Sequence, residues 1–193
     1  MQKKDLYFIT GNKHKFEVAE NFFKNCDAGN YFNLIQHDIS PPEIQSDSIG
    51  TIATSSARWA FEKIGKPLIT ADAGLQIEAL NGFPGPFVKY MNSWFNQNDL
   101  LRMMDGKLNR TAVFMDALAF VFGDMEEVFS SDTIGKLSTS PAKEDGYTVD
   151  QLFIPDGMDK SLVQLSNEER RDVWNVERWT LLTDFLIKNY DKL

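Results

Sequence analysis

The residues best suited to chemistry in this sequence are a few cations and carboxylates that stand beside short apolar segments. The clearest group is Thr10-Gly11-Asn12, which is followed by Lys13 and Lys15. The group comes directly after the apolar run 6–9. Aromatic and alanine residues then recur at helical spacing, at Phe16, Ala19, Phe22 and Phe23. The pattern predicts a buried strand, a tight turn and then a helix.

The start of such a helix favours an anion. Its first backbone N–H groups have no partner within the helix and carry partial positive charge. Thr10 and Asn12 add hydrogen-bonding side chains, and Lys13 and Lys15 add formal charge. One hypothesis is therefore a phosphate-binding corner. The alternative is an ordinary first strand and turn with solvated lysines, because short turns that contain Gly and Lys are common.

Candidate acids lie further along the chain. Leu68-Ile69-Thr70 is typical of a short buried strand, and it is expected to end in Ala71-Asp72-Ala73-Gly74. A carboxylate at such a strand end is a common position for an active-site acid in α/β proteins, and a plain turn aspartate is the alternative. Lysines together with one or two carboxylates suit Mg²⁺-assisted cleavage of a nucleotide phosphate.

The remaining pattern indicates the elements that position these residues. A strand is expected at 33–36, followed by a proline-containing loop that holds Glu43. Ser48 or Asp47 is expected to cap a helix that runs to Ile64 and ends at Gly65. The segment 81–89 contains two glycines and two prolines, which predicts a stiff loop.

The best strand candidate is 110–122, which is apolar on both faces and should be central in the sheet. Asp116 interrupts one face, so either it has a partner or the sheet is open there. Segments 127–129 and 133–137 suit antiparallel strands, which makes the predicted sheet mixed. A short helix is expected at 98–104, and a last helix begins near Ser166 and continues past Trp174, which is expected to be core.

Bulk properties exclude several classes of protein. A chain of 193 residues fits one domain, 1–193, in one or two lobes. The formal charge of −8 and the pI near 4.8 argue against a nucleic-acid binder. Cys26 is the only cysteine, which excludes an internal disulfide and fits a reducing compartment. No leader pattern and no membrane-spanning run are visible, so a cytoplasmic protein that does not bind membranes is expected.

Several separated motifs together resemble the inosine triphosphate pyrophosphatase family, whose members remove non-standard purine nucleotides. Thr10-Gly11-Asn12 with Lys15 and Glu17 is similar to the family's opening TGNxxKxxE motif. Asp72-Ala73-Gly74-Leu75 resembles half of its Asp-Asp-Ser-Gly-Leu signature. Leu80–Lys89 is similar to its Leu-x-Gly-x-Pro-Gly segment, and 150–157 resembles a later Gly-Tyr-Asp-Pro element. The resemblance extends from about residue 6 to residue 182.

The resemblance implies an α/β fold with an elongated mixed central sheet, flanking helices, and a cleft between two lobes. It also implies a homodimer and Mg²⁺-dependent hydrolysis of a nucleoside triphosphate to monophosphate and pyrophosphate. Asp72 falls on the catalytic acid that also holds the metal, Glu43 falls on a metal ligand, and Lys15 falls beside the reacting phosphates. The other substrate-binding positions fall on Thr10, Gly11, Asn12, Lys89, Tyr147, Asp150, Arg170 and Asn175.

The sequence departs from the family pattern at three places. Ala71 stands where the family has a second acid, and Tyr147-Thr148-Val149 replaces a Phe-Gly-aromatic pattern. Trp174-Asn175-Val176 replaces a Ser-His-Arg run that recognises the purine 6-oxo group. Loss of these donors should relax or redirect base choice, even toward a pyrimidine or modified base. The same losses also suit a second hypothesis, a non-catalytic nucleotide-binding or partner-binding descendant of the fold.

Overall fold

The computed structural model describes residues 2–142 and 145–193. Within these residues the strands form one seven-stranded sheet, in the order β2-β1-β3-β5-β6-β7 with β4 paired to β3. The strands are β1 (Lys4–Ile9), β2 (Phe32–His37), β3 (Leu68–Ile77), β4 (Pro84–Gly85), β5 (Thr111–Phe122), β6 (Met125–Leu137) and β7 (Phe153–Pro155). β1 pairs in parallel with β2 and β3, whereas β6 pairs antiparallel with β7. The predicted mixed α/β sheet is confirmed.

The helices follow the capping chemistry of the sequence. They are α1 (Lys13–Lys24), α2 (Ile49–Ile64), α3 (Val88–Trp94), α4 (Gln97–Met103), α5 (Asn167–Val173) and α6 (Glu177–Lys188). The hydroxyl of Ser48 accepts from the amide of Thr51 at the start of α2, and Gly65 ends that helix with a φ of 58°. Both ends of α2 are therefore confirmed. No helix among the described residues is long and apolar enough to cross a membrane.

Contacts divide the chain into two compact units. Unit 1 contains residues 1–72, 116–131 and 176–193, and unit 2 contains residues 73–115 and 132–175. The boundary falls within β3, β5 and β6, so each of these strands contributes one part to unit 1 and the other part to unit 2. Each unit is described below by itself.

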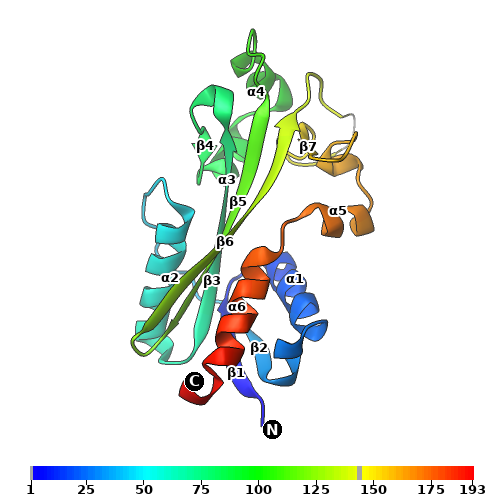
Figure 1. Ribbon diagram of the computed structural model, residues 1–193. Helices are drawn as coiled ribbons and strands as arrows, with labels where there is room; N and C mark the ends of the chain where they lie inside the picture. Colours follow the sequence, from blue (N-terminus) through cyan, green and yellow to red (C-terminus); the bar gives the residue numbers. More distant parts are fainter. Residues whose placement is uncertain (1, 143–144) are drawn as a thin grey trace. The chain divides into compact units, whose positions relative to one another are not determined.

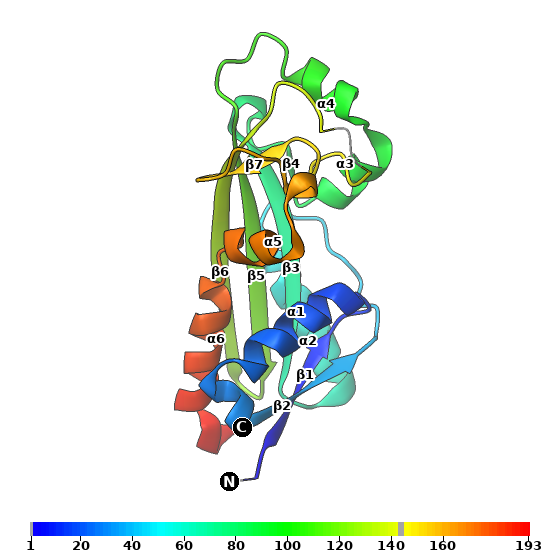
Figure 2. The same ribbon diagram turned by 90° about the vertical axis from the view of Figure 1, so that its right-hand side faces the viewer.

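Unit 1 has helices on both faces of its part of the sheet. Alternation along β1 sends Leu6 and Phe8 into a core with α1 and α6, and sends Tyr7 and Ile9 into a core with α2. β5 follows the same rule, since Phe120 joins the first core and Ala119 the second. Figures 1 and 2 agree that α1 and α6 cover one face and α2 the other.

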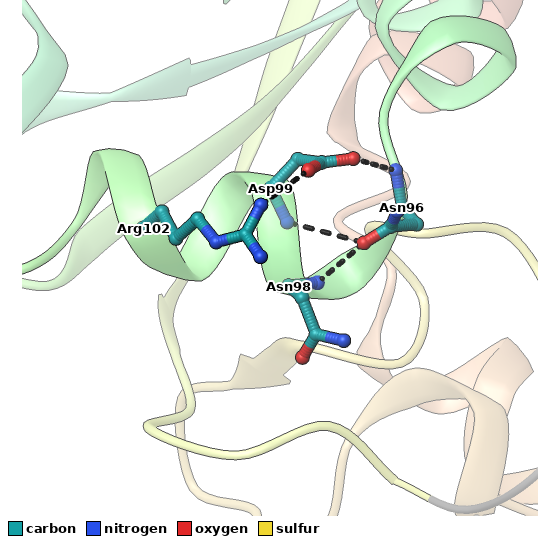
Figure 3. Close-up of polar contacts among 4 residues, drawn as sticks. All are labelled: Asn96, Asn98, Asp99 and Arg102. Atoms are coloured by element: carbon teal, nitrogen blue, oxygen red, sulfur yellow. Dashed lines mark hydrogen bonds and ion pairs between the residues drawn. The ribbon is translucent and has the colours of Figure 1, made fainter.

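Unit 2 has its own core, and its helices are short. Leu75 and Ile77 of β3 pack in this core with Met91 of α3 and Leu100 of α4. α4 is held by a reciprocal cap. The Asn96 side chain accepts from the amides of Asn98 and Asp99, and the Asp99 carboxylate accepts from the Asn96 amide (Figure 3). Asp99 also pairs with Arg102 at 3.2 Å.

Four sequence-based boundaries are wrong. β3 continues through Ala71-Asp72 to Ile77, so Asp72 lies within a strand and not in the turn after one. The segments 127–129 and 133–137 belong to one strand, β6. Within the predicted loop 81–89, Pro84-Gly85 pairs with β3 and α3 begins at Val88. The expected last helix is two helices, α5 and α6, separated by residues 174–176.

Candidate functional site

The first candidate residues lie where parallel strands of unit 1 end together. Ile9 at the end of β1 pairs with His37 at the end of β2, and Phe8 pairs with Ile69 of β3. When the second pairing is continued two residues beyond Phe8, Thr10 lies level with Ala71. The turn after β1, the residue after β2, and Ala71-Asp72 in β3 therefore lie at the same edge.

The turn after β1 is built as an open helix start. The Asn12 side chain accepts from the amide of Lys15 at 3.1 Å, and the Thr10 hydroxyl accepts from the amide of Asn12 at 3.1 Å. In the described part of the chain, the amides of Lys13 and His14 donate to no protein acceptor. These exposed amides and the nearby lysines favour an anion.

Lys15 connects this helix start to β3. Its Nζ donates to the carbonyl oxygen of Ala71 at 3.3 Å, and the contact is partly buried. The ammonium group is therefore held one residue before Asp72. Ala71 packs against the core formed with α1 and α6, so alternation directs Asp72 toward the opposite face. Thr70, two residues before Asp72, points to this same face, which α2 covers, since its hydroxyl donates to the Ala53 carbonyl in α2.

Glu43 is exposed in the loop that precedes α2. Among the described residues, its side chain makes no hydrogen bond or ion pair with another group. Those residues also contain no cluster of three or more metal-binding side chains. The structure therefore brings Lys15 next to the Asp72 position, but it fixes no contact between Glu43 and either residue. A cation held by one or two carboxylates together with substrate oxygens fits this donor set better than a closed protein cage.

Sequence reasoning missed Asp38. This residue directly follows β2, and a methyl group added at Gly11 would lie 2.7 Å from its Oδ1 atom. The carboxylate therefore lies against the turn after β1. Its position one residue beyond a strand parallel to β1 is the signal that identifies it, because the carboxyl ends of parallel neighbours share an edge.

Asp116 has a partner, which resolves the alternative left open by the sequence. Its Oδ1 atom lies 3.6 Å from Nη2 of Arg178, and the two side chains are only 21% and 12% exposed. Arg178 also donates to the Ser131 hydroxyl at 2.8 Å. Burial lowers the pKa of Arg178, and the Asp116 carboxylate partly offsets that effect. This pair joins α6 to β5 and β6 within unit 1.

In unit 2, the structure brings two predicted substrate-binding residues together. Nη2 of Arg170 lies 3.9 Å from Oδ2 of Asp150, and Nε of Arg170 donates to the Leu162 carbonyl at 2.7 Å. Burial raises the pKa of Asp150 above its ordinary value, and the Arg170 guanidinium opposes this shift. The Arg170 side chain is therefore already engaged by its own unit.

Two other predicted residues of unit 2 are exposed. Lys89 lies near the start of α3, with its Nζ 6.0 Å from the centre of the Tyr90 ring. Tyr147 is 68% exposed and lies in the loop before Asp150. Among the described residues, no hydrogen bond or ion pair joins either side chain to the Arg170–Asp150 pair. The exposure leaves both side chains accessible to a ligand.

Asn175 and Trp174 contact the sheet of unit 2. The backbone N–H of Asn175 donates to the Thr133 hydroxyl, and the side-chain Nδ2 of Asn175 donates to the Asp132 carbonyl. Trp174 ends α5 and packs edge-on against Phe114, with ring centres 5.2 Å apart. Trp174 is therefore a half-buried packing residue, as expected, but it lies between two helices and not within one.

Comparison with known proteins places these features in a family. Residues 6–174 match the Ham1 family. A dITP/XTP pyrophosphatase of Methanopyrus kandleri is 35% identical over 166 residues, which cover 86% of each chain. A dITP/XTP pyrophosphatase of Methanothermobacter marburgensis is 37% identical over 164 residues, which cover 84% of this chain and 85% of the relative.

Solved structures show the same fold at lower identity. The Staphylococcus aureus Ham1 protein matches with a TM-score of 0.80 and 23% identity, over 96% of this chain and 100% of that chain. A HAM1 protein from Coxiella burnetii matches with a TM-score of 0.82 and 17% identity, over 96% and 99% of the two chains. The family resemblance seen in the motifs is thereby confirmed. This chain belongs to the Ham1 family.

Proposed function

We propose that this protein is a nucleoside triphosphate pyrophosphatase that acts on non-standard purine nucleotides such as dITP and XTP. Membership of the Ham1 family and the activity named for its relatives support the proposal. The observation that carries it is the contact between Lys15 Nζ and the Ala71 carbonyl. This contact holds the Lys15 ammonium at the residue that precedes Asp72 in β3, and a cation close in the chain to a carboxylate supports cleavage of a phosphoric anhydride.

The reaction divides its roles among residues of unit 1. The free amides of α1 and the Lys15 ammonium hold negative oxygens of the triphosphate. Asp72 orients a water molecule and accepts its proton as the oxygen adds to a phosphorus of the α–β anhydride. The bond to the bridging oxygen breaks, and monophosphate and pyrophosphate separate. Thr10, Gly11 and Asn12 keep the turn in the shape that presents these amides.

We propose Mg²⁺ as the divalent cation, with Asp72 and Glu43 as its protein ligands. When bound, the ion neutralises phosphate charge and polarises the anhydride. Glu43 is exposed and its side chain has no hydrogen bond or ion pair among the described residues, so its carboxylate is available to a cation. Mg²⁺ commonly retains water and substrate oxygens as its remaining ligands.

The roles of the unit 2 residues remain predictions. Lys89 and Arg170 are proposed to contact phosphates, Tyr147 to stack on the base, and Asp150 and Asn175 to bind the nucleoside. A homodimer, a cytoplasmic location and a single ITPase-like domain 1–193 with two lobes are likewise proposed from the sequence. Each role can be tested by its own variant, independently of Asp72.

Base preference is proposed to be relaxed or shifted. Asn175 donates its side-chain N–H to the Asp132 carbonyl and Trp174 packs on Phe114. These contacts give the segment a structural role in unit 2. A site in which donors are not directed at a 6-oxo group discriminates weakly against bases that lack one.

A substrate panel tests the proposed function. Pyrophosphate release should be measured with Mg²⁺ for dITP, ITP, XTP, dUTP and the standard triphosphates. We expect the highest kcat/KM for dITP, ITP or XTP. The differences in kcat/KM among bases should be smaller than those of a site whose donors are directed at the purine 6-oxo group. A preference for a pyrimidine triphosphate would keep the proposed pyrophosphatase activity but change the base of the preferred substrate. No release from any triphosphate would contradict the proposal and favour a non-catalytic nucleotide-binding protein.

A further inference from the structure

The Asp38 carboxylate lies beside the open start of α1, and neither the motifs nor the family resemblance assigns it a role. Its place is fixed by the ends of β1 and β2. The Thr10 amide donates to the His37 carbonyl at 3.2 Å, and Gln36 Nε2 donates to the Thr10 carbonyl at 3.0 Å. Thr10, which precedes Gly11, is therefore held to the two residues that precede Asp38.

The close approach to Gly11 orients this carboxylate. A methyl group at Gly11 would lie 2.7 Å from Asp38 Oδ1, 3.2 Å from Cγ and 3.3 Å from Oδ2. The three atoms of the carboxylate thus lie around the space that a side chain at residue 11 would occupy. Such contact is possible only because residue 11 has no side chain.

Asp38 has no ion-pair partner among the residues that the structure describes, although Lys13 and Lys15 follow the same turn. The Lys15 ammonium donates instead to the Ala71 carbonyl. An anion that approaches the free amides of Lys13 and His14 therefore also approaches an exposed negative charge.

We propose that Asp38 makes this corner select a phosphate that arrives with a divalent cation over the bare anion. The inference rests on the proposed function and names a residue that decides whether the corner prefers the cation-bound phosphate or the metal-free phosphate. The carboxylate repels a metal-free polyphosphate, and a cation bound to the polyphosphate removes the repulsion. Asp38 is in this account a specificity-determining residue, and its removal improves binding of the wrong form.

The expected effect is modest because the carboxylate is exposed. Two unit charges about 4 Å apart in water interact by an amount that corresponds to about a fivefold change in affinity. Salt screens such an interaction, so the effect should shrink as ionic strength rises. A purely steric or structural role would not show this dependence on salt and on metal.

Calorimetric titration with inorganic pyrophosphate tests the proposal. Wild type, Asp38→Asn and Asp38→Ser should be titrated in EDTA and again in excess Mg²⁺. Asp47→Asn is the matched control, since Asp47 is an exposed aspartate at the other end of the same loop. We expect both Asp38 variants to bind metal-free pyrophosphate about fivefold more tightly at low salt, and Asp47→Asn to match wild type.

With Mg²⁺ present, the gain should shrink or disappear. Equal or weaker metal-free binding by the Asp38 variants would overturn the inference, as would a failure of both wild type and the Asp38 variants to bind the bare anion. If the variants lose only binding of the magnesium complex, Asp38 is a metal ligand and the proposal is wrong. Hydrolysis of dITP by wild type is measured separately, so failure of the proposed function remains distinguishable.

Discussion

The candidate residues of unit 1 and those of unit 2 are held in different ways. In unit 1, residues 10–12 follow β1 and Asp72 lies in β3, and the pairing of β1 with β2 and β3 fixes the level at which these residues lie. In unit 2 the candidate residues lie on short helices and loops, and three of them are engaged by their own unit. Arg170 pairs with Asp150, and Asn175 donates to β6.

The difference indicates which residues carry chemistry and which adjust binding. Strand ends are rigid and leave helix amides and a lysine available to an anion. Loop and helix-end residues that already have protein partners must exchange or share those contacts to bind a ligand. Changes to the candidate site residues of unit 1 should therefore reduce turnover, whereas changes to those of unit 2 should alter affinity, base choice or stability.

The largest expected effect is that of Asp72→Asn. Removal of the group that accepts the proton of water should lower kcat for dITP by about 100-fold or more. The variant should keep the unfolding temperature of wild type, because an amide replaces a half-buried carboxylate of the same shape. Asp124→Asn, in an exposed turn, is the control. Wild-type turnover by Asp72→Asn would remove Asp72 from the mechanism.

Lys15→Met should have the next largest effect on catalysis. Loss of a charge-assisted hydrogen bond to phosphate should reduce kcat/KM by roughly 10- to 100-fold. Lys66→Met, at an exposed lysine elsewhere in unit 1, should leave kinetics unchanged. If both variants behave alike, the effect is one of overall charge and the α1 corner has no special role.

Arg178→Met should affect stability more than turnover. It leaves the partly buried Asp116 carboxylate without its guanidinium, which should cost about 1.5 kcal/mol of unfolding free energy. Chemical denaturation measures this loss. The double variant Asp116→Asn/Arg178→Met should be less destabilised than the sum of the two single variants. Additive losses would show that the pair is not coupled.

The smallest expected effect concerns Asp150 and pH. Burial raises the pKa of Asp150 in the folded protein, so the folded state holds the proton more tightly than the unfolded chain. This contribution stabilises the fold below the ordinary aspartate pKa of about 4 and is lost as pH rises through the raised value. As pH rises through this range, the unfolding free energy of Asp150→Asn should therefore fall less than that of wild type. An identical pH profile would contradict the shift.

The sequence predicted unit 1 well because its signals are local. The apolar run before Thr10 and the cap and glycine at the ends of α2 place β1, α1 and α2 without tertiary information. The pattern predicts that β3 ends within residues 71–74, because Gly74 resembles a turn residue. Gly74 instead lies in β3, where an added Cβ would come within 2.9 Å of the Gly85 carbonyl oxygen. Such close backbone approaches cannot be read from local pattern.

The remaining differences depend on long-range contacts. β6 is one strand that lies between β5 and β7 in the sheet, and only its end at Gly135–Leu137 pairs with β7. The last helix is interrupted at 174–176, where Asn175 hydrogen-bonds β6 and Trp174 packs on Phe114. Asp38 was missed because its relation to Gly11 depends on the register of two strands. Candidate site residues should therefore be sought after every parallel strand of a predicted sheet, and not only after the strand that carries a motif.

The most direct test of this account is a crystal structure with Mg²⁺ and a non-hydrolysable analogue of dITP. Phosphate oxygens should accept from the free amides of Lys13 and His14 and from Lys15 Nζ, with the Asp72 carboxylate beside the anhydride. A triphosphate bound without contact to α1, with Asp72 away from every phosphorus, would contradict it.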